Sequence, residues 1–534
     1  VGDLFQRHFT YPISEWCQKN NIAFTGHFAC EDGLCDQISS CGGVMGHYAL
    51  MQLPGIDHLG SRITSPVLSK QASSVSRQFN GGQVLSETFG CSGWGVTFSR
   101  LAWIWGSQSV LGVTKPCLHL SAYTIEGRRK RDYPAFFSYQ EPWWEEFKQF
   151  NQWMEQHNQL MSAGIRACRV LIIPPTGVMM EEYRDTLGNR EKNIYSSAQF
   201  RLLVETLLDL QVDFELGDEK LLERYAAVQN GQVLLGNGKY DWVFVAENCS
   251  LKEATCVLLD QLKKQNGHVV YINKLPQGIE LNGPGCQLVQ NRREAIEKYL
   301  QYADFPREVS LYDPFGTVLA SRVVLHTRLV GNHLRIHIWN ASFEQKQELL
   351  LKLNRTASVA HVLPDEKRRL LPSRVGKDGN TYVPLSISGG ENIILETVEL
   401  QQQYEVPVLF AQETATLSVA SLTDKNCLTL DYASFAFGKD DFSETMPVLH
   451  IIDKLYANIA SSAENVRLRY SFYCKEVSDG MNPTLAVEDR ECVDIQCNGE
   501  SVLSHRIGWW IDRYIGEYDI SGTIQSGENE VILT

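Results

Sequence analysis

The chain has 534 residues, 43% of them hydrophobic and 21% charged, which is the composition of a folded globular protein rather than a disordered chain or a coiled coil. At roughly 150 residues per domain, this length predicts about three or four domains. The net charge of −14 argues against nucleic acid as a partner, because phosphate-backbone binding needs clustered positive charge. The apolar runs fall far short of the ~20 residues of a membrane helix, so no membrane partner is expected.

The two ends of the chain indicate a fragment. The first residue is Val1, and residues 1–15 show neither the basic start nor the apolar core of a signal peptide. Residues 527–534 have the pattern of a strand that runs up to the last residue of the sequence. We therefore expect a protein truncated at the N-terminus and also at the C-terminus, with the cytoplasm as the default location. The sequence does not specify an oligomeric state.

The 14 cysteines are spread along the chain without the regular spacing of a disulfide scaffold, so reduced thiols are expected. Cys30, Cys35 and Cys41 form the tightest group, and His27 and His47 lie nearby. No C-x2-C pair occurs in this group, and small buried side chains are a commoner use of such cysteines than a zinc site. No metal is predicted.

Residues 1–165 alternate between helical and short apolar segments. Repeated units of this kind build a parallel sheet or barrel with right-handed crossovers. This region is about half of an eight-stranded barrel of ~250 residues, so we expect the C-terminal part of a (β/α)8 TIM barrel. The expected strands cover residues 22–28, 83–89 and 116–124, and the expected helices cover residues 13–20, 66–79, 98–110 and 143–161.

Residues 166–305 are expected to form a second α/β domain. Residues 169–174 begin it with a continuous apolar run, typical of a strand covered on both faces. Strands at 212–216, 242–246 and 268–273 alternate with helices at 197–210 and 254–266, which continues a doubly wound pattern. The region has no G-x-G-x-x-G loop and no Walker A sequence, so a scaffolding role is favoured over nucleotide binding.

Beyond residue 306 alternating strands replace the helices. Residues 306–400 are expected to form an antiparallel β-sandwich, with strands at 322–330, 334–340, 348–353, 381–387 and 392–398. Residues 401–534 are expected to form a further, incomplete all-β unit, with strands at 466–473, 484–487, 492–497 and 518–520. Asn498-Gly499 is a strong hairpin signal within it.

Two carboxylates stand out by position. Glu31 closes residues 22–31 and Glu87 lies within residues 83–90, so both fall near the C-terminal ends of expected strands, where β/α barrels carry catalytic groups. Burying an unpaired acid in an apolar strand is costly. Glycosidic bond cleavage would account for both acids, because one protonates the leaving oxygen and the other acts as nucleophile or base. Alternatively, each glutamate only pairs with a neighbouring basic group or backbone amide.

The surroundings favour a sugar site, because aromatic faces pack on sugar rings and polar groups bind hydroxyls. The predicted substrate-binding residues are His27, Trp94, His119, Tyr123 and Arg129. His119 could equally be a satisfied core histidine, and the basic run that holds Arg129 is more often a solvated loop. The glycine-rich residues 89–95 are expected to form a tight turn that brings Trp94 close to a ligand.

Several segments carry a resemblance to large bacterial glycoside hydrolases in or near family 106, the α-L-rhamnosidases. These are residues 86–95 (SETFGCSGWG), 119–123 (HLSAY), 127–134 (GRRKRDYP) and 140–144 (QEPWW). The resemblance implies a barrel, a flavodoxin-like domain like the one after the barrel in some β-galactosidases, and β-sandwiches. Residues 216–219 (LGDE) match a phrase in such flavodoxin-like domains, and residues 508–512 and 527–533 resemble galactose-binding-like jelly rolls.

The resemblance also implies a function and site roles. It implies a glycosidase that cleaves a plant or host glycan, specifically an α-L-rhamnoside, with Glu31 as general acid and Glu87 as nucleophile or base. Glu87 would lie on the seventh barrel strand, while Glu31 would fall near the fifth, which departs from the fourth-strand acid of the large barrel clan and leaves the roles open. The alternatives are a β-galactosidase or β-glucuronidase, and a non-catalytic carbohydrate-binding or structural fragment. No cofactor is expected; the resemblance allows calcium, but no loop has a calcium pattern.

Overall fold

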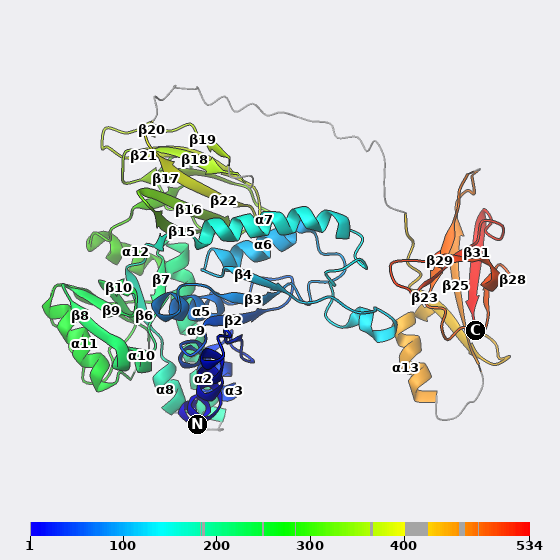
Figure 1. Cartoon of the computed structure of the whole chain (residues 1–534), viewed down its shortest axis with the longest axis horizontal. Coiled ribbons are helices and arrows are strands. Elements are labelled where there is room, and N and C mark those ends of the chain that lie inside the picture. The colour runs from blue at the N-terminus through cyan, green and yellow to red at the C-terminus, as the bar shows by residue number, and fades with distance from the viewer. Residues whose placement is uncertain are drawn as a thin grey trace. The chain divides into compact units, whose positions relative to one another are not determined.

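The structure is a computed structural model that describes residues 2–181, 183, 187–247, 250–283, 285–363, 367–400, 426–458, 465–478 and 480–534. The chain divides into two compact units (Figure 1). The larger unit contains Val1–His119 and Lys148–Leu409, and the smaller unit contains Leu120–Phe147 and Phe410–Thr534. None of the described helices combines the length and apolar character needed to cross a membrane.

The larger unit begins with a sheet of four parallel strands in chain order. These are β1 (Thr25–Gly26), β2 (Leu53–His58), β3 (Leu85–Thr88) and β4 (Lys115–Leu118). Strands β1, β3 and β4 overlap the three expected strands, but β2 was missed because Pro54 and Gly55 interrupt its apolar pattern. Consecutive parallel strands in this order are the arrangement found in a β/α barrel.

Two helices connect these strands as the sequence predicts. Helix α5 (Pro66–Phe79) has the predicted bounds, because Ser65 accepts a hydrogen bond from the Val67 amide at 3.3 Å and Pro66 occupies the first turn. Helix α6 (Phe98–Ser109) starts after Thr97, which caps it through the Arg100 amide. The other helices before residue 165 are α1 (Gly2–Phe5), η1 (Gln6–Thr10), α2 (Tyr11–Lys19), α3 (Leu34–Ser40), α4 (Met45–Tyr48), η2 (Gly127–Arg131) and α7 (Trp144–Ser162).

The second α/β region is a five-stranded sheet in the order β13-β12-β11-β6-β7, and all its pairings are parallel. In chain order this is 2-1-3-4-5, the strand order of flavodoxin-like folds. Every residue of β6 (Val170–Ile173) and β11 (Trp242–Val245) is buried, as expected for strands covered on both faces. The other strands are β7 (Phe214–Leu216), β12 (His268–Ile272) and β13 (Cys286–Val289), and the helices are α8 (Thr176–Glu181), α9 (Leu187–Asp209), α10 (Glu219–Tyr225), α11 (Glu253–Lys264) and α12 (Arg293–Tyr302).

An antiparallel ribbon interrupts this α/β pattern between α10 and β11. It contains β8 (Ala226–Gln229), β9 (Gln232–Leu235) and β10 (Gly238–Tyr240), in the order β10-β9-β8. This ribbon was not predicted from the sequence.

Two antiparallel sheets pack around one apolar core in the region after residue 306. Strands β21 (Thr381–Ile387) and β22 (Asn392–Val398) have the predicted bounds. The short strand β5 (Ile165–Arg166) joins the second sheet through β15, and so connects the end of α7 to the sandwich. The remaining strands are β14 (Val309–Tyr312), β15 (Val323–Val330), β16 (His333–Asn340), β17 (Gln347–Leu353), β18 (Ser358–Val362), β19 (Arg368–Leu370) and β20 (Arg374–Val375).

The smaller unit is mostly β-structure with its own core. Asn498 and Gly499 both have positive φ and join β27 to β28, so the predicted hairpin is confirmed. Its elements are β23 (Tyr432–Phe437), β24 (Met446–Pro447), α13 (Val448–Asn458), β25 (Val466–Cys474), β26 (Thr484–Val487), β27 (Ile495–Cys497), β28 (Glu500–Ser501), η3 (Leu503–His505), β29 (Arg506–Trp509), β30 (Gly516–Asp519) and β31 (Gly527–Leu533). The expected boundary at residue 401 lies outside the described residues.

Residues 120–147 also belong to the smaller unit, although the sequence analysis placed them in the barrel region. The carboxylate of Asp512 accepts hydrogen bonds from the Ile125 amide at 2.9 Å and from the Thr124 hydroxyl at 3.2 Å. Lys130 forms an ion pair with Glu488. These contacts form only in the folded chain, between residues far apart in the sequence. Composition along the chain therefore could not mark residue 120 as the start of a different unit. The mixed α/β and all-β fold class is correct, while the expected domain limits stay predictions.

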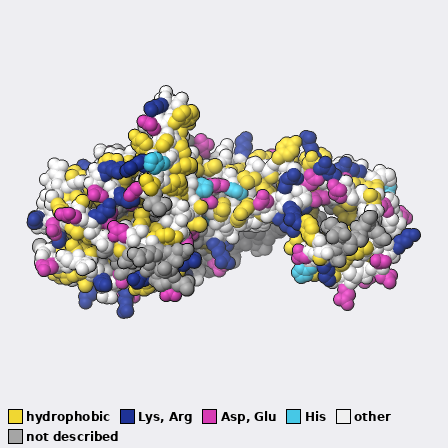
Figure 2. Space-filling view, turned by 90° about the horizontal axis from the view of Figure 1, so that it is seen from below, with side chains coloured by type: hydrophobic (Ala, Val, Ile, Leu, Met, Phe, Trp, Pro, Cys, Tyr) yellow, Lys and Arg dark blue, Asp and Glu magenta, His cyan; other side chains and the backbone are white. Residues whose placement is uncertain are grey.

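The charged side chains are mixed on the visible surface. On the face shown in Figure 2, Lys and Arg are interspersed with Asp and Glu.

Candidate active site

Four polar side chains lie at the C-terminal ends of the four parallel strands. His27 follows β1, Asp57 lies in β2, Glu87 lies in β3 and His119 follows β4. Asp57 and Glu87 are register partners across β2 and β3, so their side chains share one face of the sheet. The carboxyl ends of parallel strands are where β/α folds place catalytic groups.

Glu87 lies between two imidazole rings. Its Oε2 is 2.8 Å from Nε2 of His27, a distance at which the ring N–H donates to the carboxylate. Its Oε1 is 3.7 Å from Nε2 of His119. The Glu87 side chain is 31% exposed, so it remains open to a ligand. The structure therefore brings together three of the predicted site residues, His27, Glu87 and His119.

Asp57 lies beside these residues and was not predicted from the sequence. Its ligand atom lies within 4.8 Å of those of His27 and Glu87. Its Oδ1 is buried without a hydrogen-bond partner among the described residues. Burial raises the pKa of Asp57, and the neighbouring charge of Glu87 raises it further, while His27 lowers it. The sequence signal for Asp57 is an acid at the end of an apolar strand, but strand β2 itself was not predicted.

Glu31 has a different environment from the one expected of a catalytic acid. It is only 3% exposed, beneath the residues that follow β1. Its Oε1 accepts a hydrogen bond from the Asp57 amide at 2.8 Å, and its Oε2 accepts from the Phe28 amide at 3.1 Å and from the Tyr48 hydroxyl. Burial raises the pKa of Glu31 to about 7, although the Tyr48 hydrogen bond opposes this. Both oxygens of Glu31 therefore already accept hydrogen bonds, and the bond from the Asp57 amide positions the backbone of Asp57.

The glycine-rich loop after β3 packs on His119. A Cβ atom at Gly90 would lie 2.8 Å from Cγ of the His119 ring, so only glycine lets the loop approach this closely. His119 is also fixed through its backbone, since its amide donates to the Thr88 carbonyl at 2.9 Å. Trp94 lies half-buried in the same loop. The tight turn is confirmed, and its role in ligand contact stays a prediction.

Tyr123 and Arg129 belong to the smaller unit rather than to the unit that carries Glu87. Tyr123 is 93% exposed. Nη1 of Arg129 lies 3.6 Å from Oε2 of Glu126, in an exposed ion pair. Their predicted role in sugar binding stays a prediction.

His27, Asp57 and Glu87 could together hold a metal ion. In the part of the chain that the structure describes, this is the one group of three or more His, Cys, Asp or Glu residues close enough to do so. One imidazole and two carboxylates suit zinc better than calcium, which prefers oxygen ligands throughout. The group does not include Cys30, Cys35 or Cys41.

The comparisons with known proteins identify a fold that the chain shares with solved structures. No protein-family model and no curated protein matches the chain. Among solved structures, a rhamnosidase from Novosphingobium sp. PP1Y matches with a TM-score of 0.58 and 16% identity, over 100% of this chain and 51% of the rhamnosidase. The chain thus spans about half the length of that enzyme. This likeness shows that the chain shares its fold with part of that enzyme.

Two further similar structures are glycoside hydrolases that match more distantly. A GH42 exo-carrageenase from Bacteroides ovatus has a TM-score of 0.47 and 11% identity, over 73% of this chain and 55% of the carrageenase. A β-galactosidase from Bacillus circulans sp. alkalophilus has a TM-score of 0.48 and 9% identity, over 74% of this chain and 67% of the galactosidase.

Proposed function

We propose that the protein is a glycoside hydrolase that uses the acids at the ends of β2 and β3 to cleave an O-glycosidic bond. The observation that carries this proposal is the meeting of Asp57 and Glu87 on one face of a parallel sheet, with His27 and His119 beside them. Glycoside hydrolysis needs two carboxyl groups in different protonation states. The fold shared with part of a rhamnosidase supports the same conclusion.

The two acids have surroundings that suit different roles. We assign the general acid to Asp57, because burial and the charge of Glu87 favour its protonated form. We assign the nucleophile or base to Glu87, because its exposed carboxylate accepts a hydrogen bond from His27. This replaces Glu31 as the acid, since the oxygens of Glu31 are buried and hold the amides of Phe28 and Asp57.

His27 and His119 would orient Glu87 and bind sugar hydroxyls. The hydrogen bond from His27 restricts one carboxylate oxygen, which leaves the other free to face the reacting carbon. The ligand atoms of Asp57 and Glu87 lie within 4.8 Å of each other. This upper limit lies below the roughly 6.5–9.5 Å that separates the carboxyl groups of inverting enzymes, so we propose retention of configuration. Proton NMR of the first-formed anomer tests this step.

We propose an α-L-rhamnoside as the substrate, in line with the sequence resemblance and the rhamnosidase fold. A β-galactoside is the second candidate, which the resemblance of the flavodoxin-like region to β-galactosidases favours. A panel of aryl α-L-rhamnosides, β-D-galactosides and β-D-glucuronides, incubated with the chain and with its Glu87→Gln variant, tests both. Hydrolysis of one glycoside that disappears in the variant is the expected result, and equal rates in the two proteins would reject the proposal.

A non-catalytic carbohydrate-binding role is the alternative from another class. The sheet has four parallel strands among the described residues, whereas a closed β/α barrel has eight. Binding of these glycosides without release of the aryl group, by this chain and also by a version extended at its N-terminus, would favour that role.

A further inference from the structure

Two hydroxyl side chains flank Glu87 on β3 and lie on the opposite face of the sheet. Successive side chains of a strand alternate between the two faces, so Ser86 and Thr88 point away from the face that carries Glu87. Both residues are buried completely, with an exposed fraction of 0%. A strand face covered by a helix normally buries apolar side chains, and a buried hydroxyl is costly unless it is hydrogen-bonded. The hydroxyls of Ser86 and Thr88 therefore need a structural or functional reason.

Gln108 of α6 contacts both hydroxyls. Its Oε1 accepts a hydrogen bond from the Ser86 hydroxyl, and its Nε2 donates to Oγ1 of Thr88 at 2.9 Å. Nε2 also lies 3.4 Å from the Ile104 carbonyl oxygen, which can only accept, so this contact fixes which end of the amide donates. The Ser86 hydroxyl has a second acceptor within reach, the Glu87 carbonyl, at the longer distance of 3.2 Å. One glutamine thus spans the two strand residues on either side of Glu87.

The helix that carries Gln108 is anchored to other elements as well. The Trp105 indole N–H donates to Oδ1 of Asn158 in α7 at 3.0 Å. The side-chain amide of Asn392, at the start of the sandwich strand β22, donates to the Ala102 carbonyl of α6 at 3.0 Å. Helix α6 is therefore held by α7 and by the sandwich, and it gives Gln108 a fixed support against which β3 is placed.

Thr88 extends this arrangement to the neighbouring strand. Its carbonyl accepts a hydrogen bond from the amide of His119, just beyond β4, at 2.9 Å. Nε2 of His119 lies 3.7 Å from Oε1 of Glu87. The position of Thr88 therefore affects the carboxylate and also one of the two imidazoles beside it.

Hydrogen bonds fix a strand more closely than apolar contacts do. They are directional and hold their atoms about 3 Å apart, whereas apolar attraction has no preferred direction and lets two surfaces slide. A fully paired buried network also specifies one arrangement of the elements that it joins. The contacts of Gln108 therefore set where β3 lies along α6, and with it how far the Glu87 carboxylate reaches.

We infer that Gln108 is a positioning residue, which acts through Ser86 and Thr88 to place the Glu87 carboxylate for reaction. Gln108 contacts the strand and not the substrate. This inference rests on the proposed function, because a carboxylate needs such exact placement only if it reacts. A displacement of about 1 Å at a reacting group costs about a hundredfold in rate.

Replacing all three side chains by apolar ones separates positioning from stability. Gln108→Met alone leaves the hydroxyls of Ser86 and Thr88 without their amide partner, so the melting temperature should fall. The triple variant Ser86→Ala, Thr88→Val and Gln108→Met removes the hydroxyls too, so the melting temperature should largely recover. Its kcat on the best aryl glycoside should stay about ten- to a hundredfold below wild type, with KM within about threefold. Recovery of kcat together with the melting temperature would overturn the inference, because the three residues would then serve stability alone.

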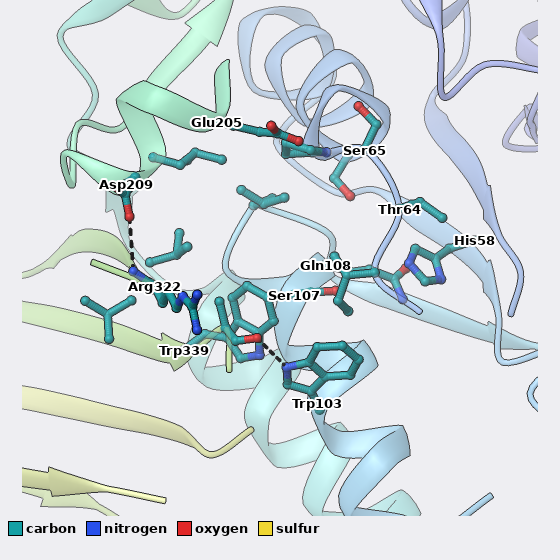
Figure 3. A pocket seen from close by; sticks show the side chains of 18 of the residues that line it. His58, Thr64, Ser65, Trp103, Ser107, Gln108, Glu205, Asp209, Arg322 and Trp339 are labelled. Carbon is teal, nitrogen blue, oxygen red and sulfur yellow. Dashed lines mark hydrogen bonds between the residues drawn. The ribbon is translucent and has the colours of Figure 1, made fainter. Parts of the chain in front are cut away.

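Single changes at Thr88 keep the test decisive if the triple variant does not fold. Thr88→Val has nearly the same shape but no hydroxyl, so kcat should fall about tenfold. Thr88→Ser keeps the hydroxyl that Gln108 binds and should retain most of the rate. Figure 3 shows Ser107 next to Gln108 on α6, and its hydroxyl donates to the Ile104 carbonyl of the same helix at 2.7 Å. Ser107→Ala is thus the matched control, which should leave kcat unchanged, whereas a wild-type kcat in Thr88→Val would overturn the inference.

Crystal structures of wild type, Thr88→Val and the triple variant give a readout that needs no activity. The Glu87 carboxyl should move relative to Asp57 by about 0.5 Å or more in the variants. If the wild-type chain hydrolyses no glycoside, the proposed function fails, while this movement would still support the placement of Glu87 by Gln108. An unmoved carboxyl in both variants would overturn that placement, whatever the activity.

Discussion

Glu87 and Glu31 are acids of the same parallel sheet region, yet their surroundings are opposite. Glu87 is 31% exposed and lies between two imidazoles, whereas Glu31 is 3% exposed and accepts hydrogen bonds from two amides and a tyrosine hydroxyl. A reacting carboxylate must reach the substrate. A carboxylate that accepts hydrogen bonds from backbone amides instead stabilises the fold most when it is buried, because these bonds are stronger where water is excluded. A place near a strand end therefore does not by itself assign a catalytic role.

Replacing Glu87 should give the largest loss of activity. Glu87→Gln keeps the size of the side chain but removes the nucleophile or base, so kcat on the best aryl glycoside should fall at least about a thousandfold. The melting temperature should change little, because the side chain is partly exposed. Glu15→Gln, an exposed change in α2, is the matched control. Wild-type rates in Glu87→Gln would remove this carboxylate from the mechanism.

Replacing Asp57 should come next and should depend on the leaving group. Asp57→Asn removes the proton donor, so hydrolysis of an alkyl glycoside should fall about a hundred- to a thousandfold. A p-nitrophenyl glycoside needs less protonation and should lose much less. Rates for both substrates with wild type and variant provide the measurement, and Asp36→Asn, an exposed change in α3, is the control. An equal loss on both substrates would argue that Asp57 is not the acid.

Helix and strand positions could largely be predicted from the sequence, and the reasons are local. The bounds of α5 follow from Ser65 and Pro66, and the β27–β28 hairpin follows from Asn498-Gly499. Strand β2 was missed because its apolar pattern is broken by Pro54 and Gly55. The placement of residues 120–147 in the smaller unit depends on Asp512, nearly four hundred residues away in the sequence, which no local pattern reveals.

The candidate site was only partly predictable for a related reason. Glu87 was predicted as a site residue from its place near the end of an expected strand, and His27 and His119 were predicted as polar groups able to bind sugar hydroxyls. Asp57 was not predicted, because its strand, β2, was not recognised in the sequence. The burial of Glu31 depends on Tyr48 and on the Asp57 amide, which approach it only in the folded chain. Sequence periodicity predicts which face of a strand a residue occupies, but it does not predict what covers that face.

Changing His27 should have a smaller effect than changing either acid. His27→Leu removes the hydrogen bond to Glu87 but leaves the carboxylate in place, so kcat should fall about ten- to a hundredfold. His27→Gln restores an N–H donor and should recover part of this loss. The same variants test whether zinc binds at this site. If hydrolysis depends on zinc, a chelator should abolish it, and both His27→Leu and His27→Gln should reduce its rate. Equal activity in His27→Leu and wild type would show that Glu87 needs no such partner.

Replacing Glu31 should have the smallest effect on activity and should act on stability instead. Glu31→Gln disturbs the hydrogen bonds to Tyr48 and to the Asp57 amide, so the free energy of unfolding should fall by about 1–3 kcal/mol, with kcat within about tenfold of wild type. A thousandfold loss of kcat at an unchanged melting temperature would instead make Glu31 the acid that the sequence indicated.

The pH dependence of this change sharpens the test. Burial raises the pKa of Glu31 from 4.5 to about 7 in the folded protein, so between these values the folded state holds a proton that the unfolded state has released. The stabilising contribution of Glu31 is then complete below about pH 4.5 and is lost as the pH rises through 7. The glutamine of the variant cannot titrate, so the difference in melting temperature between wild type and Glu31→Gln should shrink from about pH 5 to about pH 8. A constant difference would show that Glu31 is charged in the folded protein, and would return it to the set of carboxylates able to react.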